Sequence, residues 1–317
     1  MKQNDFFQDL ANTRPFLKMA FEGFAGTGKT LTASYVASGL HKRIKSKKPI
    51  VFFDTEKRLK VVKPHFDKAG ISVKVRESRT LADLVQTINL CVEGYSDILV
   101  IDSISHVWLN FLESYKKQKK RTDLYFQDWG ILKPEWKNKF SDILISVPIH
   151  IIFTGRAGFE YDYFENEATE KMELRKTGIK MKAETEMEYE PDIVVLMEKE
   201  KEMDKDTMKN IINYALVLKA PPDTINGSRF KFPTYKDFLP AIDLLLSGEY
   251  QESKVVETPD EFDDAEKEYH KRKTDREIAL DKITSIFQQL NIGTSTKDKK
   301  LKIDIVEKIF NTNSWTY

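Results

Sequence analysis

The chain has 317 residues, which is enough for one large core or for one core with a small appended domain. Its hydrophobic share of 40% and charged share of 32% are typical of a globular protein and exclude the disordered and fibrous classes. The 51 Lys and Arg residues nearly balance the 50 Asp and Glu residues, so any contact with nucleic acid must come from a local patch.

Residues 1–7 lack the apolar run of a signal peptide, and no stretch of the chain reaches the roughly 18 apolar residues of a membrane span. We therefore expect a cytoplasmic protein with no membrane contact. The single cysteine, Cys91, lies in a segment of helical period, and we expect it to be a small core residue.

Up to about residue 156, short apolar runs of strand length alternate with longer segments of helical period. This alternation predicts an α/β domain with a mostly parallel central sheet covered by helices. The expected strands are 16–21, 50–53, 71–75, 98–101 and 149–153. The expected helices, the last of which has Pro134 in its first turn, are 29–44, 81–92, 104–117 and 134–145.

After residue 156 the pattern changes to alternating stretches, 159–164 and 171–179, which predict a β-hairpin projecting from the sheet. Two further strands, 193–197 and 211–218, and a helix, 235–246, complete the domain. The expected domains are one large α/β domain at 1–246, an acidic linker at 247–266 and a small C-terminal helical domain at 267–317.

A complete phosphate-binding P-loop follows the first predicted strand and precedes the first predicted helix. Its glycines let backbone amides turn inward on phosphate, its lysine reaches the β and γ phosphates, and its last hydroxyl binds Mg²⁺. The motif predicts a site for ATP and Mg²⁺ formed by Gly23, Phe24, Ala25, Gly26, Thr27, Gly28, Lys29 and Thr30.

A second element of such a site is an aspartate at the end of a neighbouring buried strand, which holds the magnesium ion. Four consecutive aliphatic residues end at Asp102, so we expect Asp102 to bind the metal together with Thr30. Asp102 or Ser103 could also cap the helix that follows, and the two roles are compatible.

The catalytic carboxylate must lie elsewhere, because Ser103 follows Asp102 where many ring-forming P-loop ATPases have a glutamate. The strand at 50–53 ends in Asp54-Thr55-Glu56, at the same edge of the sheet where ligands bind in open α/β folds. Glu56 is the expected general base and Asp54 its competitor. The alternative interpretation is that both acids cap the following helix.

In these motifs the sequence resembles the RecA family of recombination ATPases, over residues 16 to about 220. It looks most similar to RecA-like ATPases of bacteriophage replication and recombination modules, which also carry stretches similar to 127–130, 133–136 and 189–192. The resemblance implies catalytic roles for Lys29, for Glu56 on the attacking water, for Thr154 in sensing the γ-phosphate and for Arg156 in assisting or reaching a neighbouring subunit.

The resemblance also implies two loops that face DNA, at 113–128 and 157–185. The first carries aromatic residues and a run of basic residues that suits phosphate attraction and base stacking, namely Lys116, Lys117, Lys119, Lys120 and Arg121. A solvated helix face would show the same run. In the second loop acids outnumber bases, so we expect it to contact a subunit or another protein.

We therefore expect a RecA-like ATPase that acts on single-stranded DNA in phage-type recombination or replication. Its expected partners are further copies of itself, in a ring or filament, and other recombination or replication proteins. Two alternatives stay open, a small-molecule or nucleotide kinase and a nucleotide-gated assembly protein with negligible turnover.

Overall fold

A computed structural model describes most of the chain. The described residues of the main part are 16–166, 171–204 and 207–247, and those of the tail are 282–283, 285–287, 289–290, 292–293 and 295–310. The chain divides into two units, Met1–Glu252 and Ser253–Tyr317, which are described separately. The expected linker, apart from its first residue, lies outside the described residues.

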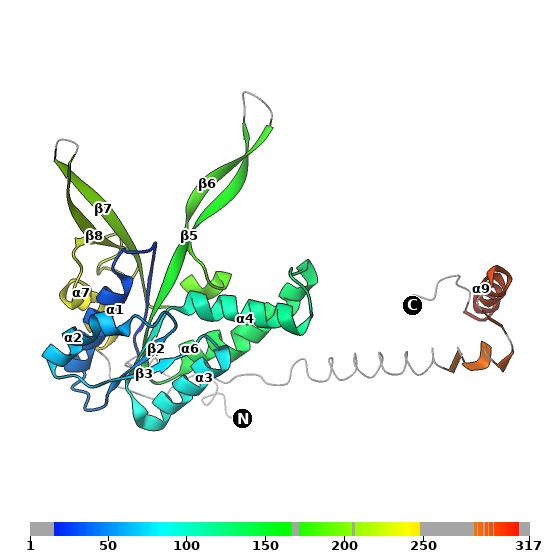
Figure 1. Cartoon of the computed structure of the whole chain (residues 1–317), viewed down its shortest axis with the longest axis horizontal. Coiled ribbons are helices and arrows are strands. Elements are labelled where there is room, and N and C mark those ends of the chain that lie inside the picture. Colours follow the sequence, from blue (N-terminus) through cyan, green and yellow to red (C-terminus); the bar gives the residue numbers. More distant parts are fainter. Residues whose placement is uncertain are drawn as a thin grey trace, which may run out of the picture. The chain divides into compact units, whose positions relative to one another are not determined.

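Among the described residues, nine strands form one sheet (Figure 1). They are β1 (Lys18–Gly23), β2 (Ile50–Asp54), β3 (Val73–Glu77), β4 (Ile98–Asp102), β5 (His150–Asn166), β6 (Lys171–Met181), β7 (Ile193–Asp204), β8 (Thr207–Lys219) and β9 (Arg229–Lys231). Their order is β3-β2-β4-β5-β1-β7-β8-β9, and β6 pairs with β5.

In the sheet order, the six strands β3, β2, β4, β5, β1 and β7 pair with one another in parallel. The strands β6, β8 and β9 pair with their neighbours in antiparallel fashion. The predicted α/β class, with a mostly parallel central sheet, is thus confirmed. Strand β1 lies between β5 and β7, and β5 separates β1 from β4.

Helices cover both faces of the sheet, α1, α2 and α7 on one face and α3, α4 and α6 on the other (Figure 1). Their bounds, with the short α5, are α1 (Lys29–Arg43), α2 (Leu59–Ala69), α3 (Leu81–Leu90), α4 (Ile104–Gln118), α5 (Trp129–Trp136), α6 (Asp142–Ser146) and α7 (Tyr235–Leu245). Local signals define several helix ends. The Thr80 side chain caps α3 by accepting from the Asp83 amide, and Gly70, with a φ of 67°, ends α2.

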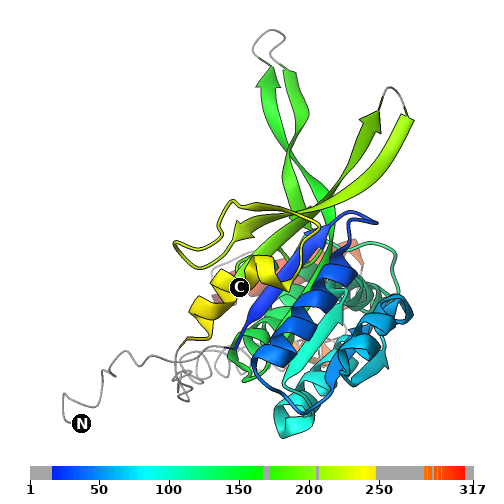
Figure 2. The same cartoon turned by 90° about the vertical axis from the view of Figure 1, so that its left-hand side faces the viewer.

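Two hairpins, β5–β6 and β7–β8, project from the same edge of the sheet (Figures 1 and 2). The first was predicted from the alternating pattern. Both are direct extensions of central strands, because β5 and β7 continue beyond their parallel pairing with β1 into antiparallel pairing with β6 and β8. Any displacement of a hairpin is therefore coupled through a continuous backbone to the strand ends next to β1.

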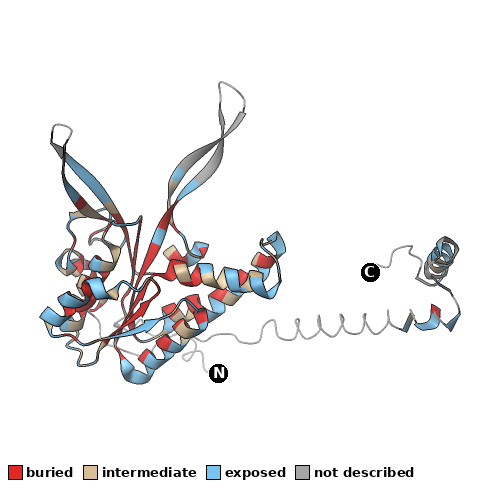
Figure 3. Ribbon diagram, viewed as in Figure 1, coloured by how far each residue is buried: buried red, intermediate tan, exposed pale blue. Residues whose placement is uncertain are grey.

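The sheet separates two apolar clusters, and buried residues concentrate along its central strands (Figure 3). Trp136 is fully buried in the second cluster, with its ring centroid 4.9 Å from that of Trp108 and 5.1 Å from that of Phe140. Trp136 is thus a core residue, as is Cys91, whose thiol pKa is raised to about 12 by burial.

The expected helix at 134–145 is wrong in its start. The helical region begins at Trp129, so Pro134 lies inside α5 and not in a first turn, and a π-helical turn, Lys137–Ser141, joins α5 to α6. Because proline has no amide donor, it removes one hydrogen bond of the helix, and the π-helical turn comes directly after this interruption.

In the tail, Thr296–Phe310 forms helix α9, within the segment where the sequence predicts a small helical domain. Across the described parts of both units, every helix is too short or too polar to cross a membrane.

Replacing the buried Trp136 by alanine should lower the free energy of unfolding by about 3–5 kcal/mol, because it removes a large ring from a packed cluster. Trp136→Phe should cost clearly less, since it keeps most of the buried area. Urea denaturation measures both variants. Phe126→Ala, at a side chain that is 95% exposed, is the control and should change stability by less than about 0.5 kcal/mol. Equal losses at the two positions would contradict this description of the core.

Candidate nucleotide site

The P-loop connects the end of β1 to the start of α1 and depends on glycines at both ends. Gly23 has a φ of 155°, and a β-carbon there would clash with the carbonyl oxygen of Met197 on β7. Gly28 has a φ of 88° and is the N-cap residue of α1. Side chains at these positions would block the turn, so the loop directs its backbone amides and the positive end of α1 to one place.

The side chain of Lys29 is folded into the loop. Its Nζ donates to the carbonyl oxygens of Gly23 at 2.7 Å and of Phe24 at 2.8 Å. Burial lowers the pKa of Lys29, and the charges of Asp102 and Glu56 oppose this shift. The lysine therefore lies within the field of both carboxylates that the sequence singles out.

The carboxylate of Asp102 joins α1, β4 and β5. Thr30 Oγ1 donates to Asp102 Oδ2 at 2.7 Å, and Thr154 Oγ1 donates to Asp102 Oδ1 at 2.5 Å. Sheet register explains the second contact, because Asp102 and Thr154 are direct partners on β4 and β5. Thr154 is fully buried, so its hydroxyl serves this carboxylate.

The donor set at Asp102 fits a magnesium ion. A hydroxyl and a carboxylate oxygen are hard oxygen ligands, and they already lie side by side. Burial raises the pKa of Asp102, while hydrogen bonds from Thr154 and Thr30 oppose the shift. In the described part of the chain, no group of three or more His, Cys, Asp or Glu side chains could hold a metal, so the remaining ligands would come from phosphate and water.

Asp54 and Glu56 have different surroundings. Asp54 is buried and accepts the backbone amides of Glu56 at 3.0 Å, Lys57 at 2.7 Å and Leu59 at 3.0 Å. Its oxygens are thus used in shaping the turn between β2 and α2. The capping interpretation holds for Asp54, and the turn that Asp54 stabilises presents Glu56.

Glu56 lies at the centre of a charged network. Arg156 donates to Glu56 Oε1 through Nη2 at 2.9 Å and Nε at 3.2 Å, and His106 Nδ1 lies 3.6 Å from the same oxygen. Burial acts to raise the pKa of Glu56, but the hydrogen bond and charge of Arg156, with smaller contributions from His106 and Arg58, leave it lowered. Glu56 is thus ionised at neutral pH.

The sequence offers no signal for several residues that complete this edge. Thr55 Oγ1 contacts His106 Nδ1 at 2.8 Å and accepts the Ser103 amide at 2.8 Å, so it ties the end of β2 to the start of α4. From β7, Lys199 Nζ donates to the P-loop carbonyl of Ala25 at 3.0 Å. These contacts join residues far apart in the chain, so spacing could not reveal them.

The predicted DNA-facing segment 113–128 is a loop only in part, because α4 continues to Gln118. Within it, Lys116 pairs with Glu113 at 2.6 Å and Arg121 pairs with the buried Asp128 at 2.6 Å. Lys117, Lys119 and Lys120 are exposed. The aromatic side chains of Phe126 and Tyr125 are exposed as well, at 95% and 56%, and the Arg121 guanidinium lies 4.4 Å from the Tyr125 ring centroid.

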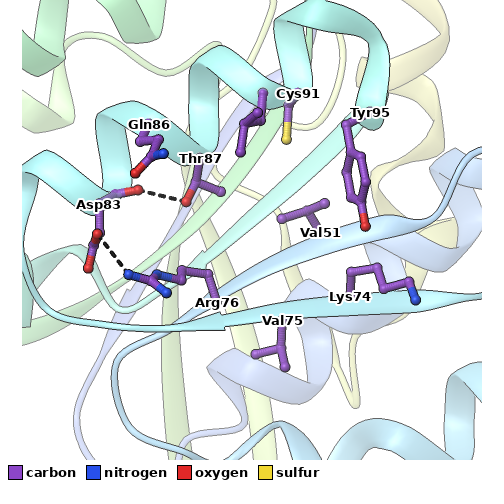
Figure 4. A pocket seen from close by; sticks show the side chains of 10 residues that line it. Val51, Lys74, Val75, Arg76, Asp83, Gln86, Thr87, Cys91 and Tyr95 are labelled. Carbon is purple, nitrogen blue, oxygen red and sulfur yellow. Dashed lines mark hydrogen bonds and ion pairs between the residues drawn. The ribbon is translucent and has the colours of Figure 1, made fainter.

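A separate cavity of about 380 Å³ lies between the edge strand β3 and α3 (Figure 4). Arg76 and Asp83 form an ion pair at 2.9 Å on one side of it, and Tyr95 lies on the other. No residue predicted from the sequence to bind nucleotide or metal lines this cavity.

The family model described as an AAA domain matches residues 16–230, which is more than half of the chain. Among solved structures, a KaiC-like protein from the hyperthermophilic archaeon Pyrococcus horikoshii is similar, with 17% identity, 69% of this chain and 87% of that chain covered, and a TM-score of 0.42. No curated protein matches the chain.

The residue before the P-loop makes a testable electrostatic contribution. Glu22 is fully buried, and burial, followed by the negative charge of Glu188, raises its pKa from 4.5 to about 8. The folded state therefore binds a proton that the unfolded state has released between these pH values. The stability contributed by protonated Glu22 is present below pH 4.5 and is lost as pH rises toward 8.

Glu22→Gln removes this dependence and should become progressively more stable than the unmodified protein as pH rises. The difference in unfolding free energy should grow by at most about 1.4 kcal/mol per pH unit. Urea denaturation at several pH values between 4.5 and 8 measures it. A difference that does not change with pH would show that Glu22 is ionised in the folded state throughout.

Proposed function

The chain belongs to the AAA domain family and carries a P-loop nucleotide-binding site, and we propose that it binds ATP with Mg²⁺ and hydrolyses it. One observation carries the proposal. The P-loop, the Thr30–Asp102 oxygen pair and the ionised Glu56 all lie at the carboxyl edge of neighbouring parallel strands. This is the edge at which open α/β sheets bind their ligands.

Each residue has a separate task in this proposal. The P-loop amides and Lys29 bind the phosphates, and Thr30 and Asp102 hold the magnesium ion, which neutralises charge on the phosphates when bound. Lys29 can leave the carbonyls of Gly23 and Phe24, because phosphate oxygens are stronger acceptors for an ammonium group.

Glu56 is the carboxylate that orients the attacking water. It is ionised, and its neighbour Asp54 is already committed to three backbone amides. Arg156 holds Glu56 Oε1 and belongs to β5, so the position of the base is coupled to the β5–β6 hairpin. Thr154 contacts Asp102 from the same strand and acts as the sensor of the metal and the γ-phosphate.

Glu56→Gln should retain ATP binding but slow phosphate release at least about 100-fold, the scale of a lost general base. Asp54→Asn should instead lower stability, since it weakens the acceptor of the turn amides. Release of inorganic phosphate, binding of a fluorescent ATP analogue and thermal melting separate these effects. Lys29→Ala is the binding-deficient comparison, and Lys57→Ala, at an exposed neighbour, is the control. Normal turnover in folded Glu56→Gln would remove Glu56 from the mechanism.

We further propose that single-stranded DNA stimulates the ATPase and that the protein acts as a homo-oligomer in recombination or replication. The support is the segment 119–128, where exposed Tyr125 and Phe126 follow the exposed Lys119 and Lys120 within a few residues of the chain. Aromatic faces stack on bases of any sequence, and lysines attract the backbone. The resemblance to bacteriophage ATPases that act in recombination and replication also supports single-stranded DNA as the ligand.

The basic residues differ in how available they are for DNA. Lys116 and Arg121 are engaged with acids, so the sharper variant replaces Lys117, Lys119 and Lys120 by glutamine. This variant should lose DNA stimulation while keeping basal ATP binding. Its log–log salt dependence of DNA affinity should become shallower by about 0.7 for each lost phosphate contact.

The matched control replaces Lys42, in the last turn of α1, with Lys45 and Lys47, just beyond that helix, and should leave DNA binding unchanged. Equal DNA affinity and salt dependence in both triple variants would refute the DNA proposal at this segment. A parallel screen for phosphorylated small molecules and nucleotides tests the kinase alternative, and ATP binding without phosphate release would favour the nucleotide-gated assembly protein.

A further inference from the structure

The β7–β8 hairpin passes directly beside the P-loop. Gly23 of β1 is the register partner of Met197 on β7, and the next side chain on the same face of β7 is Lys199. On the antiparallel partner strand, Asn213 is directly opposite Lys199. The pair Lys199–Asn213 therefore lies at the point where the hairpin leaves the sheet.

Both side chains face the loop. Lys199 Nζ donates to the Ala25 carbonyl at 3.0 Å, and a β-carbon added at Gly26 would lie 3.3 Å from the same nitrogen. A β-carbon added at Gly28 would lie 3.0 Å from Asn213 Nδ2. The hairpin thus contacts the P-loop at its middle and at its junction with α1.

Neither side chain is fully satisfied in the described structure. Asn213 Oδ1 is buried and has no hydrogen-bond partner among the described residues. Lys199 forms no ion pair with a carboxylate of the described chain, although its neighbours Glu198 and Glu200 both pair with Arg229. An unpaired ammonium bonded to a neutral carbonyl at the loop is free to exchange that carbonyl for a stronger, anionic acceptor.

The other cations near the loop are already engaged. Lys29 is the P-loop lysine itself, and Arg156 and Arg58 both contact Glu56, at 2.9 Å and 3.4 Å. Among the described residues beside the P-loop, Lys199 is therefore the cation outside the P-loop motif that is not paired with a carboxylate. Its stem is long and flexible, so the head group can follow a ligand without moving the strand.

We propose that Lys199 is a second phosphate-binding cation of this site, supplied by the β7–β8 hairpin of the same chain. The inference rests on the proposed ATP binding. A cation stabilises the bound nucleotide with the greater phosphate charge more strongly, so Lys199 raises the affinity for ATP more than the affinity for ADP. It also makes the β7–β8 hairpin responsive to the nucleotide.

The test compares the dissociation constants of ATP and ADP, measured by calorimetry on the full chain, for Lys199→Met, Lys199→Arg and Lys201→Met. Lys199→Met should weaken ATP binding on the order of tenfold, the effect of one lost charge-assisted hydrogen bond, and ADP binding much less. Lys199→Arg should retain most of the preference for ATP. Lys201→Met, two residues further along the same strand and also exposed, should bind both nucleotides normally.

Two outcomes would overturn the inference while leaving the proposed function intact. Unchanged affinities in Lys199→Met would show that its ammonium does not act on phosphate. Equal losses for ATP and ADP would show that Lys199 only supports the shape of the loop. If the unmodified protein bound neither nucleotide, the proposed function itself would fail, and the inference with it.

Discussion

The buried carboxylate of Asp102 accepts hydrogen bonds from Thr30 on α1 and Thr154 on β5, and the site depends on these two contacts. They fix the first turn of the P-loop helix against two adjacent strand ends. A carboxylate with little access to water is costly unless it is bonded, so the surrounding elements are held in register around it. The same oxygens are those suited to a magnesium ion, and the structural and chemical roles therefore coincide.

The two hairpins extend this arrangement beyond the sheet. Strand β5 carries Thr154 and Arg156 before it enters one hairpin, and β7 carries Met197 and Lys199 before it enters the other. Each hairpin thus begins near residues that contact the P-loop, Asp102 or Glu56. Under the proposed function, the continuous backbone of β5 and β7 links nucleotide binding at the P-loop to the position of the hairpins.

The two acidic residues at the end of β2, Asp54 and Glu56, have different roles. Asp54 uses both oxygens on the amides of the following turn, and that turn places Glu56 beside Arg156 and His106. The capping and catalytic interpretations of such a pair do not compete here. The geometry assigns the cap to the first acid and exposes the second to the site.

The sequence alone determined the elements whose signals are local. The period of apolar residues located most helices and every described strand except the short β9, although it divided β5 into two. The glycines and lysine of the P-loop located the phosphate site, because these features depend on neighbours within a few residues. Local reasoning placed Pro134 in the first turn of a helix, but it lies inside α5. The packing around the helix, and not the preference of proline for a first turn, decides where the helix begins.

Only the tertiary structure decided which distant side chains meet. The engagement of Thr154 with Asp102, the ion pair of Arg156 with Glu56 and the approach of Lys199 to Ala25 all follow from strand order and register. Spacing along the chain carries no information about these contacts, because the residues are brought together by the parallel pairing of strands that are separated by whole helices.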